Sequence, residues 1–177
     1  SFINRKLLYQ DKQNNCVFVG YSADGKPSFA CRRGTNTAKK FVGDVPGCDY
    51  THCIYLNHNT DRLIVSESPI DTMSIMTFME KKGKDPKSYN YLILSGTNKM
   101  EALETITKEN PNIQTVILAL DNDDAGRKAG NTAVALLNQQ GFTGKVKDFY
   151  PPMAKDWNDE LKIENHLALE QKREVSQ

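Results

Sequence analysis

The 177-residue sequence lacks the marks of several classes of protein. It shows no signal peptide and no apolar run close to the roughly 20 residues that cross a membrane as a helix. Internal repeats and low-complexity segments are also missing. The composition, with 38% hydrophobic and 25% charged residues, is that of an ordinary globular chain. We therefore expect a cytoplasmic protein without a membrane partner.

Cysteines are few, and none belongs to a C-x-x-C pair. Structural zinc sites usually contain such close ligand pairs. The spacing therefore favours reduced, partly buried thiols, while a zinc site completed by His52 or His58 stays open as the alternative. The four positions, all in the first third of the chain, are Cys16, Cys31, Cys48 and Cys53.

Charge is nearly balanced overall but unevenly distributed. Residues 1–60 contain eight Lys or Arg and four Asp, whereas residues 61–177 contain fifteen Lys or Arg and eighteen Asp or Glu. This asymmetry fits a protein that holds an anion with its front part and a cation with its rear part, although an ordinary solvated surface explains it equally well. The first residue is Ser rather than Met, so we expect a piece of a longer protein.

Residues 1–60 have the pattern of short antiparallel strands. Two strand-like runs, Cys16–Tyr21 and Pro27–Arg33, flank the segment SADGK, whose Asp-Gly pair is a strong hairpin signal. Residues 53–57 form another strand-like run. We expect a small antiparallel β-rich subdomain over residues 1–60.

From residue 61 onward, apolar strands alternate with helices. This pattern predicts an α/β fold in which helices flank a four-stranded parallel sheet with right-handed crossovers. We expect this core to span residues 61–150 and a separate C-terminal segment to span residues 151–177. The predicted strands cover residues 63–66, 91–96, 115–121 and 145–150, and the predicted helices cover residues 69–82, 99–109 and 124–140.

Two of the predicted strands end in acids. Glu67 follows the first strand, and Asp121 and Asp123 follow the third. In a sheet of order 2-1-3-4 these two strands are neighbours, about 4.8 Å apart, and their carboxyl ends share one edge. Carboxylates that close repel each other unless a cation lies between them, and oxygen ligands suit Mg²⁺ or Mn²⁺. The sequence therefore predicts a divalent metal site.

Neighbouring residues support this site. Asp71 lies one turn into the first helix and can hold a metal-bound water or orient another side chain. Gly126 allows close backbone approach at the start of the third helix, where free amides can meet a phosphate.

Helix capping is the alternative interpretation of these acids. Ser66 or Ser68 can cap the first helix, and Asp123 or Asp124 the third. Capping does not explain Glu67, which ends a strand.

The motifs around these acids resemble those of the Toprim domain, a fold shared by bacterial primases, topoisomerases of types IA and II, and certain nucleases. The resemblance rests on SESPID, ALDNDDAG and KDWNDEL, and it is closest to primase-like Toprim proteins of plasmids, phages and conjugative elements. The front stretch FVGYSADGKPSFACRRGTN also resembles the region ahead of the Toprim core in such proteins. One departure is Ser68, where many Toprim proteins have Gly.

The resemblance implies a role for each acid. Asp121 and Asp123 would bind Mg²⁺ or Mn²⁺ with Asp124 as a helper, and Glu67 would serve as a metal ligand or as the general acid or base. Asp71 would support the site. Three residues of the last motif, Lys155, Asp156 and Asn158, would lie at its rim, with Lys155 meeting a phosphate. For Trp157 we favour packing in the core.

Basic residues in the front part, interleaved with Phe29 and Phe41, have the composition of a surface that binds single-stranded nucleic acid. An ordinary solvated hairpin face is an equal alternative. The basic residues are Arg32, Arg33, Lys39 and Lys40.

By resemblance, we expect a primase-like nucleotidyltransferase of a bacterial mobile element. Its partners would be single-stranded DNA, nucleoside triphosphates, and a helicase, a relaxase or other domains of the parent chain. A metal-dependent nuclease and a non-catalytic nucleic-acid-binding module are the alternatives. A phosphotransfer receiver is weaker, because it leaves Glu67 and the KDWND motif unexplained.

Overall fold

Short runs of apolar residues separated by turns fold the first part of the chain into a four-stranded antiparallel sheet of order β1-β2-β3-β4. The computed structural model describes residues 2–36, 38, 39, 41–97 and 99–175, with side chains described up to residue 170. Both predicted hairpin strands are confirmed, and Gly25, with a φ of 78°, closes the turn between them. The strands are β1 (Leu8–Gln10), β2 (Cys16–Tyr21), β3 (Pro27–Arg33) and β4 (Val42–Asp44).

A second, five-stranded sheet has the order β5-β7-β6-β8-β9. Four of its strands run parallel, so the predicted parallel sheet is confirmed, and they have the 2-1-3-4 order that we considered for it. The fifth strand pairs antiparallel with β7, through Ile54 and Ile93. Residues 53–57, which we expected in the N-terminal meander, therefore contribute their strand to the larger sheet instead. The strands are β5 (Ile54–Leu56), β6 (Arg62–Ser66), β7 (Asn90–Ile93), β8 (Thr115–Ala119) and β9 (Lys145–Asp148).

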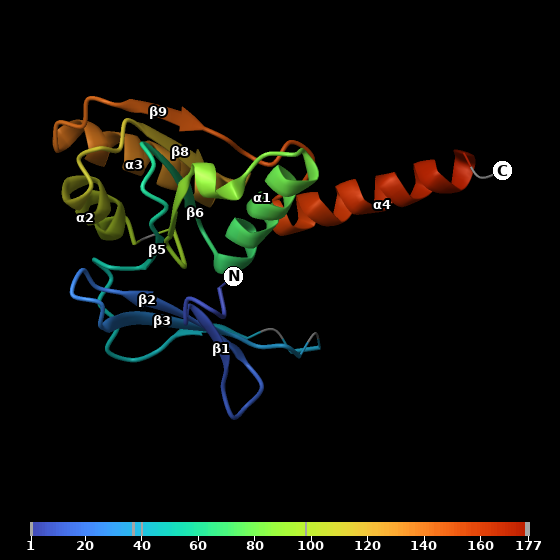
Figure 1. Cartoon of the computed structure of the whole chain (residues 1–177), viewed down its shortest axis with the longest axis horizontal. Coiled ribbons are helices and arrows are strands. Elements are labelled where there is room, and N and C mark those ends of the chain that lie inside the picture. The colour runs from blue at the N-terminus through green and yellow to red at the C-terminus, as the bar shows by residue number, and fades with distance from the viewer. Residues whose placement is uncertain (1, 37, 40, 98, 176–177) are drawn as a thin grey trace.

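Helices flank the larger sheet, and each predicted helix is present. In Figure 1, α1 lies beside α4 at one end of the molecule, and α2 lies near α3 at the other, in agreement with their contacts. No helix in the described part of the chain is both long and apolar enough to span a membrane. The helices are α1 (Pro69–Lys81), the 3-10 turn η1 (Pro86–Ser88), α2 (Glu101–Glu109), α3 (Asp124–Gln139) and α4 (Trp157–Val175).

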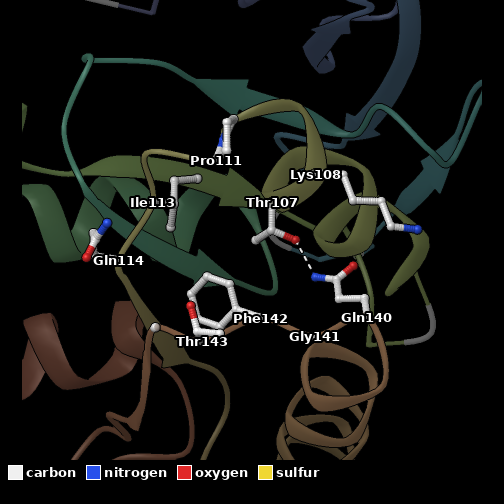
Figure 2. Close-up of a pocket in the computed structure, with 10 residues that line it drawn as sticks. Thr107, Lys108, Pro111, Ile113, Gln114, Gln140, Gly141, Phe142 and Thr143 are labelled. Carbon is white, nitrogen blue, oxygen red and sulfur yellow. Dashed lines mark hydrogen bonds between the residues drawn. The ribbon is translucent and has the colours of Figure 1, made fainter.

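Loops that lead into β8 and β9, together with the end of α2, line an open pocket of about 260 Å³. Figure 2 shows the Gln140 amide donating to the Thr107 hydroxyl in its wall, at 2.6 Å. These loops lie at the amino ends of their strands, whereas the acids singled out in the sequence lie beyond the carboxyl ends of β6 and β8. The pocket is therefore separate from the candidate site.

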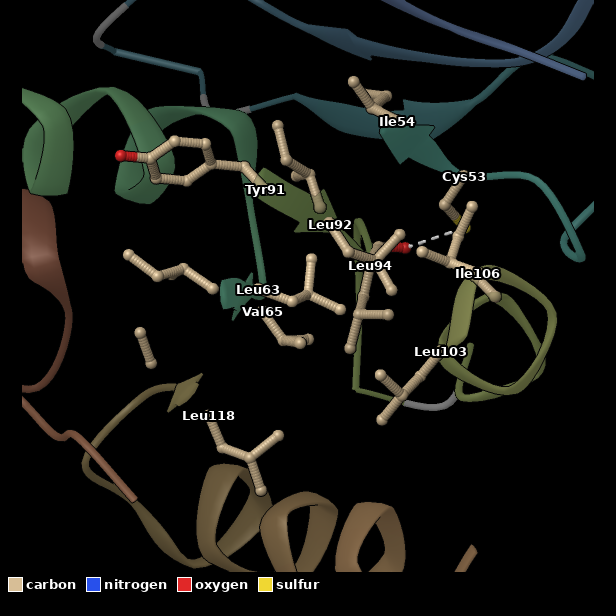
Figure 3. Packing of buried hydrophobic residues seen from close by; sticks show 14 of the residues in the cluster. Cys53, Ile54, Leu63, Val65, Tyr91, Leu92, Leu94, Leu103, Ile106 and Leu118 are labelled. Carbon is tan, nitrogen blue, oxygen red and sulfur yellow. Dashed lines mark hydrogen bonds between the residues drawn. The ribbon is translucent and has the colours of Figure 1, made fainter. Parts of the chain in front are cut away.

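The interior strands of the larger sheet are almost inaccessible to solvent. Figure 3 shows Leu63, Val65, Leu92 and Leu118 packed together, and each is completely buried. Burial of one such side chain stabilises the fold by about 1.5–3 kcal/mol. Side chains of the N-terminal sheet, such as Phe18, belong to the same cluster, so the two sheets share one core.

The two sheets are also joined by a lysine that is nearly buried. The Lys99 ammonium lies 2.6 Å from a carboxylate oxygen of Asp44 in β4 and donates to the carbonyl of Ser95, which follows β7. The ring centroids of Phe29 and Tyr50 lie 5.3 and 5.0 Å from the same nitrogen. This cation therefore ties the loop after β7 to the N-terminal sheet through an ion pair and two cation–π contacts.

We expect Lys99→Met to lower the free energy of unfolding by about 2–4 kcal/mol, because it leaves the carboxylate of Asp44 partly buried without its partner. Lys108→Met is the matched control, since Lys108 forms an exposed pair with Glu104 and its loss should cost less than about 0.5 kcal/mol. Urea unfolding of the two variants measures the difference. Equal stabilities would contradict a stabilising role for Lys99.

Candidate active site

Parallel pairing places the ends of β6 and β8 side by side. Ser66 lies opposite Ala119, Glu67 follows β6 directly, and Asp121 follows β8 after one residue. The carboxylate of Glu67 accepts a hydrogen bond from the backbone amide of Asp121 at 3.1 Å. The structure therefore brings Glu67 and Asp121 together at the carboxyl edge of the sheet.

The start of α3 packs directly onto this edge. A Cβ atom on Gly126 would lie 2.1 Å from the carbonyl oxygen of Asp121 and 3.0 Å from a carboxylate oxygen of Glu67, so only glycine fits. The amide of Gly126, which we expected to face a phosphate, instead donates to Asp123 at 2.8 Å. Gly126 thus sets the approach of the helix to the strand.

Asp123 has two partners at once. One carboxylate oxygen caps α3 through the amide of Gly126, and the other lies 2.9 Å from the ammonium of Lys155. Ser68 caps α1 by accepting from the amide of Asp71. The capping interpretation therefore holds for Asp123 and Ser68. Asp124 is exposed in the first turn of α3.

Asp71 links α1 to the start of α4. Its side chain is buried, takes a hydrogen bond from the hydroxyl of Ser68, and accepts from the backbone amide of Asn158 at 3.3 Å. Asp156 caps the same end of α4, because it accepts from the amide of Asp159 at 2.7 Å. Asp71 thus holds the KDWND segment against α1, and Asp156 stabilises the start of α4 within that segment.

The loop of residues 151–156 is fixed by the middle residue of the D-N-D motif. The backbone amide of Asn122 donates to the carbonyl of Lys155 at 2.7 Å, and its side-chain amide donates to the carbonyl of Pro151 at 3.0 Å. The motif therefore positions the loop that carries Lys155 through a residue that sequence reasoning did not assign.

Two further side chains hold this loop and the helix that follows it in place. Glu160 is only 4% exposed, and one of its carboxylate oxygens accepts from the amides of Met153 and Ala154 at 2.9 and 2.8 Å. The indole of Trp157 donates to the carbonyl of Ala119 at 3.1 Å, and its ring stacks on Phe149. Sequence reasoning missed Glu160, although an acid in the first turn of a helix is a known signal for contacts with preceding amides.

The basic residues of the N-terminal sheet have different surroundings. Arg32 stacks over the ring of Phe41 at 5.4 Å, whereas Phe29 is buried beneath Lys99 and cannot offer a base-stacking surface. Arg33 and Lys39 are exposed. Lys40 lies outside the described residues. A cavity of about 300 Å³ beside this region is lined by Gln13, Asn15, Gly34, Thr35, Asn36, Lys39 and Phe41.

Sequence comparison agrees with this architecture. The family model described as Toprim-like matches residues 64–161, which is more than half of the chain. The chain belongs to the Toprim-like family. A second family model, described as a protein of unknown function (DUF3991), matches residues 1–60. No curated protein matches the chain.

Solved primase structures share the fold of this Toprim protein. The primase fragment of the bacteriophage T7 primase-helicase aligns with a TM-score of 0.63 at 19% identity, over 96% of this chain and 65% of that one. A DNA primase domain from Pseudomonas aeruginosa gives 0.56 at 17%, over 92% and 54%. The E. coli primase catalytic core gives 0.54 at 16%, over 89% and 53%. The chain thus spans less than two thirds of each of these structures.

Negative charge is concentrated at the carboxyl edge of the Toprim sheet. Burial, together with the charges of four neighbouring acids, raises the pKa of Asp121 from 3.8 to about 7. Burial also raises the pKa of Glu67, against the opposing hydrogen bond from the amide of Asp121. For Asp71, burial raises the pKa, while the Ser68 hydroxyl and the charge of Arg33 oppose the rise. The four acids acting on Asp121 are Glu67, Asp71, Asp156 and Asp123.

The residues at this edge fit a divalent ion in their chemistry. All of the candidate donors are carboxylate oxygens, and one oxygen of Asp121 is buried without a hydrogen-bond partner among the described residues. Within the same part of the chain, no group of three or more His, Cys, Asp or Glu side chains is arranged to hold a metal ion. Two of the acids have other partners in this arrangement, because Glu67 accepts from a backbone amide and Asp123 pairs with Lys155.

We expect Asp121→Asn to make the protein more stable at pH 8 but not at pH 4. The folded protein binds this proton more tightly than the unfolded chain, so stability is lost as the pH rises from about 4 through 7. Because the edge of the sheet is partly solvated, the gain at pH 8 should be only about 1–2 kcal/mol.

Thermal unfolding across this pH range, in the presence of EDTA, measures the effect. Asp148→Asn, which removes an exposed acid from β9 and leaves Asp121 in place, is the control and should keep the wild-type change of stability with pH. A variant of Asp121 that is no more stable than wild type at pH 8 would rule out the electrostatic repulsion described above.

Proposed function

We propose that this chain is the Toprim module of a primase-like protein that processes DNA in a bacterial mobile element, and that it catalyses metal-dependent nucleotidyl transfer in the cytoplasm. The observation that carries this proposal is the meeting of Glu67 and Asp121 at neighbouring strand ends. The fold similarity supports it, because one similar structure is of the T7 lagging-strand DNA polymerase interacting with primase domains, in a complex with an RNA/DNA hybrid and dTTP. Another is of a DnaG primase catalytic domain bound to single-stranded DNA.

Asp121, Asp123 and Glu67 would hold Mg²⁺ or Mn²⁺, with Asp124 as a helper at the exposed side. When bound, the ion would stabilise negative charge on the phosphate oxygens of the substrate. The partnerless oxygen of Asp121 supports its assignment as the principal ligand. Asp71 would have a structural role, because it holds the start of α4 in place.

Glu67 has the properties of a general acid or base. Burial raises its pKa above the usual value for a glutamate, as is common for carboxyl groups that take up or release a proton in catalysis. In our proposal it takes the proton from a nucleotide 3′-oxygen during bond formation, or returns one in the reverse direction.

The nucleic acid would follow the positive side chains that border the acids. Arg33 is close enough to influence Asp71 electrostatically, and the same part of the chain carries the stacked Arg32 and the exposed Lys39. Lys40 is assigned to the same surface from its sequence position alone. Lys155, with Asp156 and Asn158 beside it, would meet a phosphate at the rim of the site.

The proposal also includes other domains of a longer parent chain. Because the chain spans less than two thirds of the similar primase structures, priming would require parts supplied by a longer parent chain, or by a helicase or relaxase partner. We therefore assign the metal-dependent chemical step to this module and template handling to the whole assembly.

We expect labelled single-stranded DNA to be extended in the presence of nucleoside triphosphates and Mg²⁺ or Mn²⁺. Asp121→Asn should lower the rate by about 100-fold or more, the usual scale for removing a group that acts in the transition state. Asp148→Asn, an exposed acid on the same sheet, should retain wild-type activity.

Other products would decide between the alternatives. Metal-dependent shortening of the DNA that Asp121→Asn abolishes would identify a nuclease with the same acids. Binding of DNA without any chemical change, unaffected by metal or by the substitution, would identify an accessory module and would refute the proposed transferase.

A further inference from the structure

The ion pair between Lys155 and Asp123 involves an acid that the proposed function assigns to the metal. The ammonium lies 2.9 Å from one carboxylate oxygen, and the amide of Gly126 donates to the other at 2.8 Å. Both oxygens of Asp123 are therefore already in contact with positively polarised groups. A divalent ion can reach the oxygen that faces Lys155 only if the ammonium moves away.

The backbone of Lys155 is fixed, but its side chain is not enclosed. The carbonyl of Lys155 accepts from the amide of Asn122, and Glu160 holds the two preceding residues of the loop. The side chain, in contrast, is 63% exposed, against 31% for Asp123. The ammonium can thus leave the carboxylate without any rearrangement of the loop.

We propose that Lys155 is an internal cation that competes with the divalent ion for Asp123 and that becomes available to a substrate phosphate when the ion displaces it. This inference rests on the proposed function. An ammonium and a divalent ion repel each other at this distance, so the two cations cannot share one carboxylate oxygen. Because an exposed ion pair is weak, Lys155 should lower the metal affinity without preventing binding.

The competition makes metal binding and phosphate binding interdependent. An ion on Asp123 frees Lys155 for an anion, and an anion that engages Lys155 leaves Asp123 free for the ion. Such coupling is reciprocal, so each ligand should raise the affinity for the other by the same factor. Lys155 would therefore favour occupation of the site by metal and phosphate together.

A titration with Mn²⁺ alone, in which electron paramagnetic resonance measures the free ion, tests the competition. Lys155→Met should bind Mn²⁺ about two- to fivefold more tightly than wild type, the range expected for loss of an exposed ion pair. Lys162→Met is the matched control, because Lys162 is exposed to a similar degree and pairs with Asp159 instead. It should bind Mn²⁺ with wild-type affinity.

The Asp123→Asn background separates direct competition from a general effect of charge. Direct competition predicts that Lys155→Met has no further effect on Mn²⁺ affinity in this background. A gain that persists there, an equal gain in Lys162→Met, or no gain in Lys155→Met would overturn the inference. Thermal unfolding of each variant confirms that the compared proteins are folded.

Failure of this inference is distinguishable from failure of the proposed function. If wild type binds Mn²⁺ and Asp121→Asn weakens that binding, the proposed metal site stands, whatever the effect of Lys155→Met. Wild type that binds no Mn²⁺ refutes the metal site, and the competition is refuted with it.

Discussion

Parallel pairing of β6 with β8 is the constraint on which the candidate site depends. With Ser66 opposite Ala119, the residues that follow the two strands emerge at the same edge, and Glu67 meets the amide of Asp121. A shift of one residue in this register would turn every side chain of β6 to the other face and disrupt the packing of Leu63, Ile64 and Val65, which are buried on both faces of the sheet. The packing of the sheet and the position of the acids are therefore fixed by the same interaction.

Acids gathered at this edge oppose folding, and the surrounding structure offsets part of their repulsion. The start of α3 supplies an amide to Asp123, Lys155 supplies a positive charge, and the backbone of Asp121 supplies a donor to Glu67. Asp121 is the residue least compensated, since one of its oxygens is buried without a partner in the described part of the chain. Local instability concentrated at one residue is typical of a site that acts on a ligand.

Features that depend on the local sequence could be predicted, whereas features that depend on contacts between residues far apart in the sequence could not. Apolar runs that alternate with helical patterns indicated the parallel strands, and the residue after the first run indicated the position of Glu67, because both can be read from local sequence. The three-residue strand β5 is too short to show which sheet it joins. Lys99 and Glu160 acquire their roles from groups folded against them, and Phe29, which we expected to serve nucleic-acid binding, is covered by Lys99.

The only tryptophan of the chain lies at the junction between the sheet and the KDWND segment. Its ring is 4% exposed and stacks on Phe149 at 4.7 Å. The protein therefore has an intrinsic fluorophore in the KDWND segment, which packs beside the acidic edge of the sheet. Detachment of that segment would change the fluorescence of the indole. Unfolding of the N-terminal sheet alone would not, because that sheet contains no tryptophan.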